Sequence, residues 1–422
     1  MSRYAVVGGG IAGLAAAYEL VRQGDEVVLH EASDRLGGKL RTERFAGADV
    51  DVAPDAFLAR RPEAVQLCDE LGLRDRFETP AVASSYVWSR GALRPIPCGQ
   101  VLGVPTDFVA LARSGIVSPA GVARAALEPW WPGQPLGDDA SIGEVIARRF
   151  GHETLERLVD PLLGGINAGD TNQLSIDTVA PQIAAAARAD RSLTRALRRA
   201  SAASPAGPVF YGLRGGMETL ATALVAAIDA AGGRIETGSA VASPDELDAD
   251  GVVWATPRPD LVAYSSVTLV LFAYPDSAVT RPLDASGFLV PRPEGLLMTA
   301  CSWASTKWAH LAAPGRFLLR VSAGRHGDER VDAMTDEAVV ARLRDDLALT
   351  MGVAGEPIEV AVHRWRQAFP QYPPGHLDRM REMIAGSSSS ASLAGAVVGG
   401  VGIPACIGSG RAAAARLRLR AA

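Results

Sequence analysis

The hydrophobic pattern at the N-terminus predicts a strand, a glycine-rich turn, a helix and a second strand in close succession. The apolar segment Tyr4–Val7 forms the first strand and Gly8–Gly13 forms the turn, from which a helix begins near Ile11. A second strand over Glu26–His30 brings Glu31 to its end. This order within one unit of roughly 30 residues is typical of a Rossmann-type βαβ fold.

Helical patterns dominate the middle of the chain. A short amphipathic helix begins at Pro62 and ends at Gly72. No strand pattern is visible from about Leu102 to Ala203, where Ser141 begins a helix as its capping residue and Gln182–Ala203 is rich in alanine and arginine. We therefore expect a helical subdomain in this block.

Strand patterns return in the second half of the chain. Gly215-Gly216 opens a helix, and the strands that follow it, Arg234–Thr237 and Gly251–Ala255, are expected to rejoin the first sheet. Later strands, separated by proline and glycine turns, predict an antiparallel sheet: Val267–Phe272, Phe288–Val290, Leu296–Cys301, Phe317–Val321 and Ile358–Trp365. The run Ser387–Ser390 predicts a loop.

The first turn has the chemistry of a dinucleotide site. Gly8 permits a tight turn out of the strand, Gly10 lets the backbone approach a pyrophosphate, and Gly13 lets the helix pack closely on the sheet. The helix N-terminus directs its N–H groups at the phosphates. A carboxylate at Glu31 accepts hydrogen bonds from ribose hydroxyls and disfavours NADP, whose 2′-phosphate it would repel.

One further segment favours FAD over NAD, and a second is compatible with a flavin. Gly37-Gly38-Lys39-Leu40-Arg41-Thr42 allows a loop to pass over the diphosphate, with Lys39 or Arg41 supplying positive charge. Near the other end of the chain, Gly399–Pro404 is a glycine-rich turn with Pro404 expected at the first position of a helix through Ala405–Leu419. If that helix N-terminus faces a flavin ring, its dipole stabilises the anionic reduced form; taken alone, the segment is equally a capped helix.

Composition excludes several classes of protein. The 422 residues exceed the size of a single core, so two or more domains are expected, and the net charge of −5 gives no support to nucleic-acid binding. Four cysteines form no Cys-x-x-Cys pair and six histidines include no pair at ligand spacing, so we expect neither metal nor disulfides. No apolar run reaches the ~20 residues of a membrane span, and the first motif begins at residue 8, so we expect no leader segment and a cytoplasmic location.

Taken together, these blocks resemble the FAD-dependent protoporphyrinogen/coproporphyrinogen oxidase family within the amine oxidase-like flavoproteins. The resemblance covers nearly the whole chain. The matching stretches are Gly8–Thr42, Ala53–Arg61, Pro95–Pro97, Pro161–Ile166, Gly212–Met217, Ser305–Trp308, Arg364-Trp365 with Pro370–Tyr372, and Gly400–Arg411.

The resemblance implies an α/β fold with a discontinuous Rossmann-type FAD-binding domain, an antiparallel-sheet substrate domain and a helical subdomain. The expected FAD-binding segments are 1–52, 205–260 and 390–422; the substrate domain takes 53–100 and 261–389, and the helical subdomain 101–204. The implied FAD contacts are Gly8, Gly9, Gly10, Ile11, Ala12, Gly13, Glu31, Ala32, Lys39, Ala53, Pro54, Asp55, Ala56, Val241, Trp365, Val401, Gly402, Ile403 and Pro404.

The resemblance also implies the reaction: dehydrogenation of coproporphyrinogen III to coproporphyrin III in haem biosynthesis, with six electrons passed through FAD to O2 and three hydrogen peroxide formed. The flavin carries the hydride transfer, so no catalytic side chain is expected. Cations suited to the substrate carboxylates are Arg60, Arg61, Arg94 and Lys307. The alternatives are a protoporphyrinogen IX oxidase, an amine oxidase-like enzyme, a carotenoid desaturase, and a catalytically impaired flavin-binding homologue.

Two positions depart from the pattern of the family. Ala53 stands where the family usually has glycine, and the segment 240–260 is shorter than usual. The shortened segment leaves fewer residues for one edge of the FAD-binding domain and bears on the contact expected at Val241.

Overall fold

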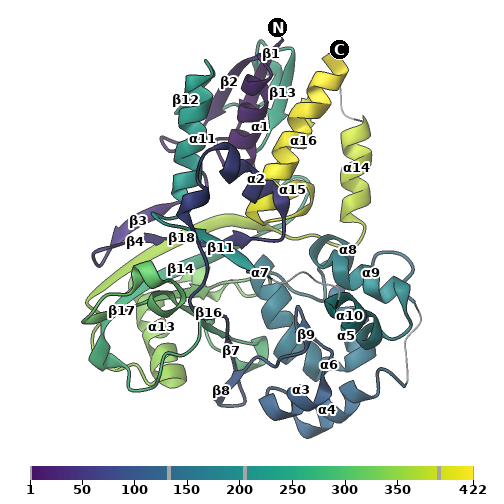
Figure 1. The fold of residues 1–422 in the computed structure, drawn as a ribbon, viewed down its shortest axis with the longest axis vertical. Coiled ribbons are helices and arrows are strands. Elements are labelled where there is room, and N and C mark those ends of the chain that lie inside the picture. The colour runs from purple at the N-terminus through teal and green to yellow at the C-terminus, as the bar shows by residue number, and fades with distance from the viewer. Residues whose placement is uncertain (1, 131–134, 203–206, 387–390, 422) are drawn as a thin grey trace. The chain divides into compact units, whose positions relative to one another are not determined.

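The computed structural model describes residues 2–130, 135–202, 207–386 and 391–421 (Figure 1). The loop expected at Ser387–Ser390 lies outside these residues. Contacts divide the chain into two compact units. The first contains residues 1–79, 208–262 and 377–422, and the second contains residues 80–207 and 263–376. The segments 53–79 and 377–386 lie in the first unit, whereas the sequence assigned them to the substrate domain.

The first unit is built on a parallel five-stranded sheet with the order β12-β2-β1-β13-β19. Its strands are β1 (Arg3–Val7), β2 (Glu26–Glu31), β12 (Arg234–Thr237), β13 (Gly251–Trp254) and β19 (Ala391–Leu393). Its helices are α1 (Ile11–Arg22), α2 (Pro62–Glu70), α11 (Glu218–Ala230), α14 (His376–Gly386), α15 (Ala396–Gly399) and α16 (Ile403–Ala421). The predicted Rossmann-type sheet is confirmed.

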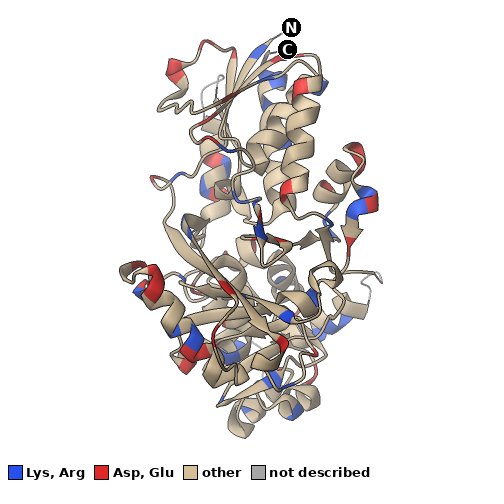
Figure 2. Ribbon diagram, turned by 90° about the vertical axis from the view of Figure 1, so that its left-hand side faces the viewer, with Lys and Arg blue, Asp and Glu red and all other residues tan. Residues whose placement is uncertain are grey.

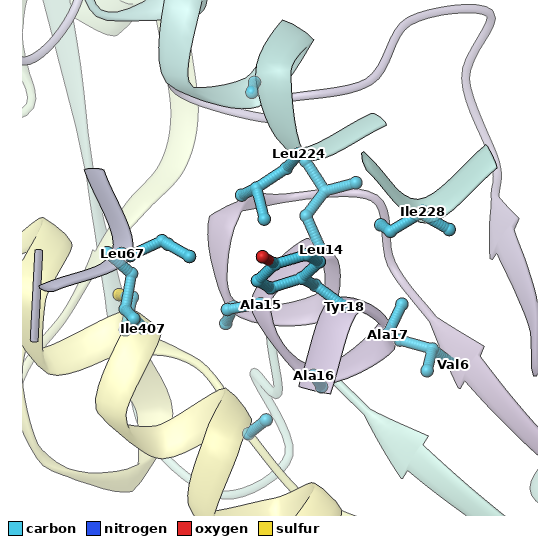
Figure 3. Close-up of a cluster of buried hydrophobic side chains, with 14 of the residues drawn as sticks. Val6, Leu14, Ala15, Ala16, Ala17, Tyr18, Leu67, Leu224, Ile228 and Ile407 are labelled. Carbon is cyan, nitrogen blue, oxygen red and sulfur yellow. The ribbon is translucent and has the colours of Figure 1, made fainter. Parts of the chain in front are cut away.

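Alternation along β1 explains how this sheet is packed. Tyr4 and Val6 join the core formed with the helices, whereas Ala5 and Val7 pack on the other face. On the helix face, the ring of Tyr18 from α1 lies among aliphatic side chains that include Leu14 and Leu224 (Figure 3). This core joins the two ends of the chain, because α1 and α16 pack against each other.

Smaller elements complete the first unit. β3 (Thr42–Phe45) and β4 (Ala48–Asp51) form a hairpin. β5 (Phe57–Leu58), β11 (Phe210–Leu213) and β6 (Phe77–Glu78) form a three-stranded antiparallel sheet, and two single-turn helices lie at η1 (Arg74–Arg76) and η3 (Pro244–Glu246).

The second unit contains a seven-stranded sheet with the order β18-β14-β17-β16-β15-β7-β8. Its strands are β7 (Tyr86–Ser89), β8 (Ala92–Pro95), β14 (Tyr264–Pro275), β15 (Gly287–Leu289), β16 (Met298–Trp303), β17 (Arg316–Ala323) and β18 (Glu359–Pro370). All neighbours pair antiparallel except β15 and β7, so the expected antiparallel sheet is mixed but mostly antiparallel. Its core takes in Val339, Leu343 and Leu347 of α13 (Asp336–Met351).

Short helices of the second unit accompany this sheet. They are η4 (Asp276–Ala278), η5 (Arg292–Glu294), α12 (Ala304–Lys307), η6 (Ala309–Leu311) and η7 (Arg330–Ala333). The helical block has its own buried core, which includes Leu111, Ile146, Phe150, Leu158 and Leu197. Its elements are β9 (Gln100–Val101), β10 (Val104–Pro105), α3 (Phe108–Ser114), α4 (Pro119–Ala126), α5 (Ile142–Phe150), α6 (His152–Thr154), the π-helix η2 (Leu155–Gly164), α7 (Gly165–Asn167), α8 (Ile176–Val179), α9 (Pro181–Ala189) and α10 (Leu193–Ala202).

The alanine- and arginine-rich segment Gln182–Ala203 is helical as expected over its described residues, but it forms two helices, because the chain breaks between α9 and α10. The buried Glu128 accepts hydrogen bonds from the Leu193 N–H at 2.6 Å and the Ser192 hydroxyl at 2.9 Å. These bonds satisfy the N-terminus of a new helix at Leu193. A carboxylate distant in sequence therefore fixes the break.

Candidate functional site

The Gly8–Gly13 turn joins β1 to α1 and combines tight packing with one open position. Gly8 adopts φ +106° and donates its N–H to the His30 carbonyl at 2.8 Å. A Cβ on Gly13 would overlap the Gly8 carbonyl oxygen, so glycine lets α1 pack on its strand. A Cβ on Gly10, by contrast, would meet no described atom within 4 Å. Gly10 therefore borders open space.

That open space lies at the N-terminus of α1. Gly10 is the N-cap residue and offers no side chain to the first backbone N–H groups, and the first turn of the helix contains no acidic residue. Unpaired N–H groups and the positive end of the helix dipole favour an anion at this position. The turn can therefore hold a diphosphate.

Glu31 is fixed beside the turn. Its Oε2 accepts the Gly9 N–H at 2.7 Å, and its Oε1 accepts the Ser33 N–H at 2.9 Å and the Ser33 hydroxyl at 2.7 Å. A carboxylate has about four lone-pair positions, so these three bonds leave capacity for ribose hydroxyls. Ser33, which the sequence analysis did not single out, orients this acceptor.

The Gly37–Leu40 loop packs on the same turn. The Gly37 N–H donates to the Gly9 carbonyl at 2.8 Å, and a Cβ on Gly38 would lie 3.1 Å from the Gly10 Cα. Arg35, which the sequence analysis missed, braces the loop by donating to the Leu40 carbonyl at 3.1 Å and to the Gly38 carbonyl. The sequence does contain a sign of this role, namely an arginine just before a glycine pair. A tight loop leaves backbone carbonyl groups that need hydrogen-bond donors, and a nearby arginine can supply them.

A second set of bonds holds the end of this loop. The Thr42 N–H donates to Glu218 at 2.8 Å, and the Thr42 hydroxyl donates to Asp51 at 2.6 Å. Asp51 also accepts the Met217 N–H at 2.8 Å. The segment 215–218 is thereby tied to the Gly37–Thr42 extension, a link between distant parts of the chain that no local pattern reveals.

Lys39 and Cys406 are electrostatic neighbours. Lys39 is solvent-accessible, yet the surrounding protein restricts hydration of its ammonium group, which lowers its pKa, while the interaction with Cys406 acts in the opposite direction. Burial raises the pKa of Cys406 to about 11 and keeps it a neutral thiol. A poorly hydrated ammonium is stabilised by an adjacent anion, as a diphosphate would provide.

The C-terminal turn belongs to the same unit. Gly395 donates its N–H to the Ser409 hydroxyl at 2.8 Å, and a Cβ on Gly410 would overlap the Ala12 carbonyl oxygen, so α16 packs closely on the start of α1. α16 begins at Ile403, which makes Pro404 its second residue rather than its first; proline is still accommodated in a first turn. Val401 is half-buried and Gly402 is exposed.

The other expected contacts of the first unit lie close to these elements in the chain. Ala53–Ala56 follows Val52, whose N–H donates to the Arg41 carbonyl at 3.0 Å, and leads into β5, which packs on α16. Val241 packs against the small apolar cluster formed by Ala5, Val7 and Val252. Ala32 is exposed directly after Glu31.

The expected substrate cations are divided between the two units. Arg60 and Arg61 are exposed in the first unit, and Arg61 pairs with Glu63 at 2.9 Å. Arg94 lies in the second unit and donates from Nε to the Ser89 carbonyl at 2.8 Å. Lys307 places its ammonium 5.2 Å from the ring centre of Trp308. Trp365, expected to contact FAD, is half-buried on β18 of the second unit.

Charge distribution, potential metal ligands and helix hydropathy give three observations. Basic and acidic residues are interspersed in both units (Figure 2). Among the described residues, no three His, Cys, Asp or Glu side chains gather as a metal site requires. No helix in the described part of the chain is both long and apolar enough to cross a membrane.

Comparison with known proteins places the chain in a family. The sequence model of the flavin containing amine oxidoreductases matches residues 11–257 and 241–418. Coproporphyrinogen III oxidase of Bacillus subtilis is 33% identical over 97% of this chain and 96% of that protein, and coproporphyrinogen III oxidase of Mycobacterium tuberculosis is 36% identical over 97% and 96%. The crystal structure of a candidate protoporphyrinogen oxidase from Exiguobacterium superposes with a TM-score of 0.87, at 28% identity, over 99% of both chains.

The chain therefore belongs to the flavin-containing amine oxidoreductase family. FAD is accordingly its cofactor, and the first unit fits that cofactor. The open space at Gly10, the uncapped N-terminus of α1, the fixed carboxylate of Glu31 and the ammonium of Lys39 supply what a diphosphate and a ribose require. A putrescine oxidase at 17% identity, with a TM-score of 0.70, shares the fold.

Proposed function

We propose that this protein is an FAD-dependent oxidase that converts coproporphyrinogen III to coproporphyrin III in haem biosynthesis. Six electrons and six protons leave the substrate, and three O2 become three hydrogen peroxide. Full-length similarity to the coproporphyrinogen III oxidases of two distant bacteria carries the proposal. The fit of the first unit to FAD supports it.

The proposed FAD contacts divide by the part of the cofactor they hold. The Gly8–Gly13 turn, the first turn of α1 and Lys39 hold the diphosphate, and Glu31 with Ala32 holds the ribose. The remaining proposed contacts are Ala53, Pro54, Asp55, Ala56, Val241, Trp365, Val401, Gly402, Ile403 and Pro404. When bound, FAD supplies the hydride acceptor and the electron path to O2.

Because FAD supplies the redox chemistry, the side chains of the protein have to bind and orient the substrate. The substrate is a large tetracarboxylate, so Arg60, Arg61, Arg94 and Lys307 are proposed to meet its propionates. Arg61 pairs with Glu63, and such exposed ion pairs contribute little stability, so Arg61 can exchange that partner for a propionate at small cost. We propose no acid–base residue and a cytoplasmic location, in keeping with free cysteines at Cys68, Cys98, Cys301 and Cys406.

A turnover assay tests the proposed function. Purified holoenzyme is mixed anaerobically with coproporphyrinogen III, protoporphyrinogen IX or a panel of amines, and bleaching of the flavin absorbance is recorded; O2 is then admitted and porphyrin fluorescence is followed. We expect bleaching and fluorescence with coproporphyrinogen III above all. A preference for protoporphyrinogen IX would reassign the substrate, bleaching by amines alone would refute the proposal, and inertness towards every compound would indicate an impaired homologue.

A further inference from the structure

The short strand β5 and its neighbour β11 have two different faces. Their register pairs Leu58 with Phe210 and Phe57 with Tyr211. Phe57 and Tyr211 turn to one side, where both contact Phe77, with ring centres 5.7 and 4.7 Å apart respectively. Because side chains alternate along a strand, Leu58 and Phe210 lie together on the opposite face.

That opposite face is exposed and apolar. Leu58 is 44% exposed and Phe210 is 41% exposed. Val209 precedes Phe210, is 48% exposed, and accepts the Ala59 N–H at 2.9 Å through its carbonyl. Leu58 and Phe210 thus form one exposed apolar patch, which we name the β5–β11 platform. A folded protein gains nothing from exposing two paired large apolar side chains, which favours a binding role.

Positive charge follows the platform directly in the chain. Arg60 and Arg61 are both exposed, and Arg61 pairs with Glu63 in the first turn of α2. β5 also packs on α16, the helix that begins at the proposed FAD contact Ile403. An apolar surface next to guanidinium groups complements a molecule with a flat apolar body and carboxylates at its rim.

We propose that the β5–β11 platform binds the macrocycle of the tetracarboxylate porphyrinogen, with Phe210 and Leu58 as specificity-determining residues. This inference rests on the proposed function for the identity of the ligand. Phe210 and Leu58 cover the apolar body of the macrocycle, while Arg61 leaves Glu63 for a propionate. The platform binds and orients substrate and touches no reacting bond.

The test compares Phe210→Ala with two controls in the FAD-loaded enzyme. Phe210→Leu keeps an apolar contact, and Leu349→Ala removes a side chain that is 61% exposed on α13. Removing the phenyl ring should raise both the KM for coproporphyrinogen III and the Kd for coproporphyrin III about tenfold, with kcat within about twofold. Phe210→Leu should recover most of the affinity, and Leu349→Ala should leave all three values unchanged. FAD content and melting temperature confirm folding.

A substitution at Arg61 gives a second, independent test of the platform. Arg61→Gln should weaken binding of a tetracarboxylate porphyrin more than binding of protoporphyrin IX, which has two carboxylates. Equal KM and Kd values for Phe210→Ala and the unaltered enzyme would overturn the platform while the proposed function stood. If the unaltered enzyme does not turn over coproporphyrinogen III but its binding of coproporphyrin III still depends on Phe210, the proposed function is overturned and the platform stands.

Discussion

Replacing Gly10 by Ala separates folding of the first unit from its capacity to hold FAD. Gly10 has φ −74° and ψ 175°, which any L-residue adopts, and a Cβ there would meet no described atom within 4 Å. The substitution also reduces the freedom of the unfolded chain. We therefore expect the free energy of unfolding of the apoprotein to change by less than about 1 kcal/mol.

The effect on FAD should be large by comparison. The added methyl group occupies the space into which the diphosphate is proposed to fit, and inserting a methyl group into a filled contact costs about 1–3 kcal/mol. At about 1.4 kcal/mol per factor of ten, the Kd for FAD should rise roughly 5- to 150-fold. Stability and affinity should therefore respond in clearly different ways.

Two glycines give matched comparisons. Gly137→Ala also places its Cβ in open space, but in the second unit, and should alter neither property. Gly13→Ala forces a Cβ onto the Gly8 carbonyl and should cost the apoprotein about 1–3 kcal/mol. Flavin fluorescence quenching measures affinity, and urea unfolding of the apoprotein measures stability. A Gly10→Ala protein that folds normally and binds FAD as tightly as the unaltered chain would refute the diphosphate position.

Three further predictions concern Glu31 and the cysteines. Glu31→Ala should release FAD on desalting, because it removes the ribose acceptor and the bond that holds Gly9; a variant that stays fully yellow would contradict this role. At pH 8, iodoacetamide should label the exposed Cys98, as read by peptide mass spectrometry, and spare Cys68, Cys301 and Cys406, since burial raises the pKa of those thiols, to about 12 at Cys68 and about 11 at Cys406. Because the Cys406 thiol ionises near pH 9 when unfolded and near pH 11 when folded, its contribution to stability is complete below pH 9 and is lost as the pH rises to about 11. In urea titrations, Cys406→Ala should lose less stability than the unaltered protein as the pH rises from 9 to 11. The same pH dependence in both proteins would argue against this role of the Cys406 thiol.

Local patterns were sufficient for the first βαβ unit. The turn, α1 and β2 depend on residues adjacent in sequence. Each glycine or apolar side chain that was used to predict them has one clear structural role. The glycines of the C-terminal turn were equally visible. Recognising that the two ends of the chain serve one sheet required the family resemblance, since the contact between Gly410 and Ala12 leaves no periodic signal.

Tertiary contacts decided the features that sequence reasoning missed. Glu128 accepts the first backbone N–H of a helix that begins 65 residues away, and Arg35 and Glu218 brace a loop in which the sequence singled out only the glycines, Lys39 and Arg41. The two-residue strand at Phe57-Leu58 is too short for a period to be read, and its exposed face is defined only by pairing with Phe210. Short strands and distant polar contacts carry little local information.

The packing of α1 against α16 has a consequence for how the chain is made. β1 and α1 are translated before the second unit, whereas β19 and α16, which complete their sheet and core, are translated after it. The second unit is fully synthesised before then, because its last residue is His376. The strands of the first sheet therefore keep apolar surface uncovered until α16 has been made, which exposes the nascent chain to aggregation and makes removal of α16 damaging to the site at the Gly8–Gly13 turn.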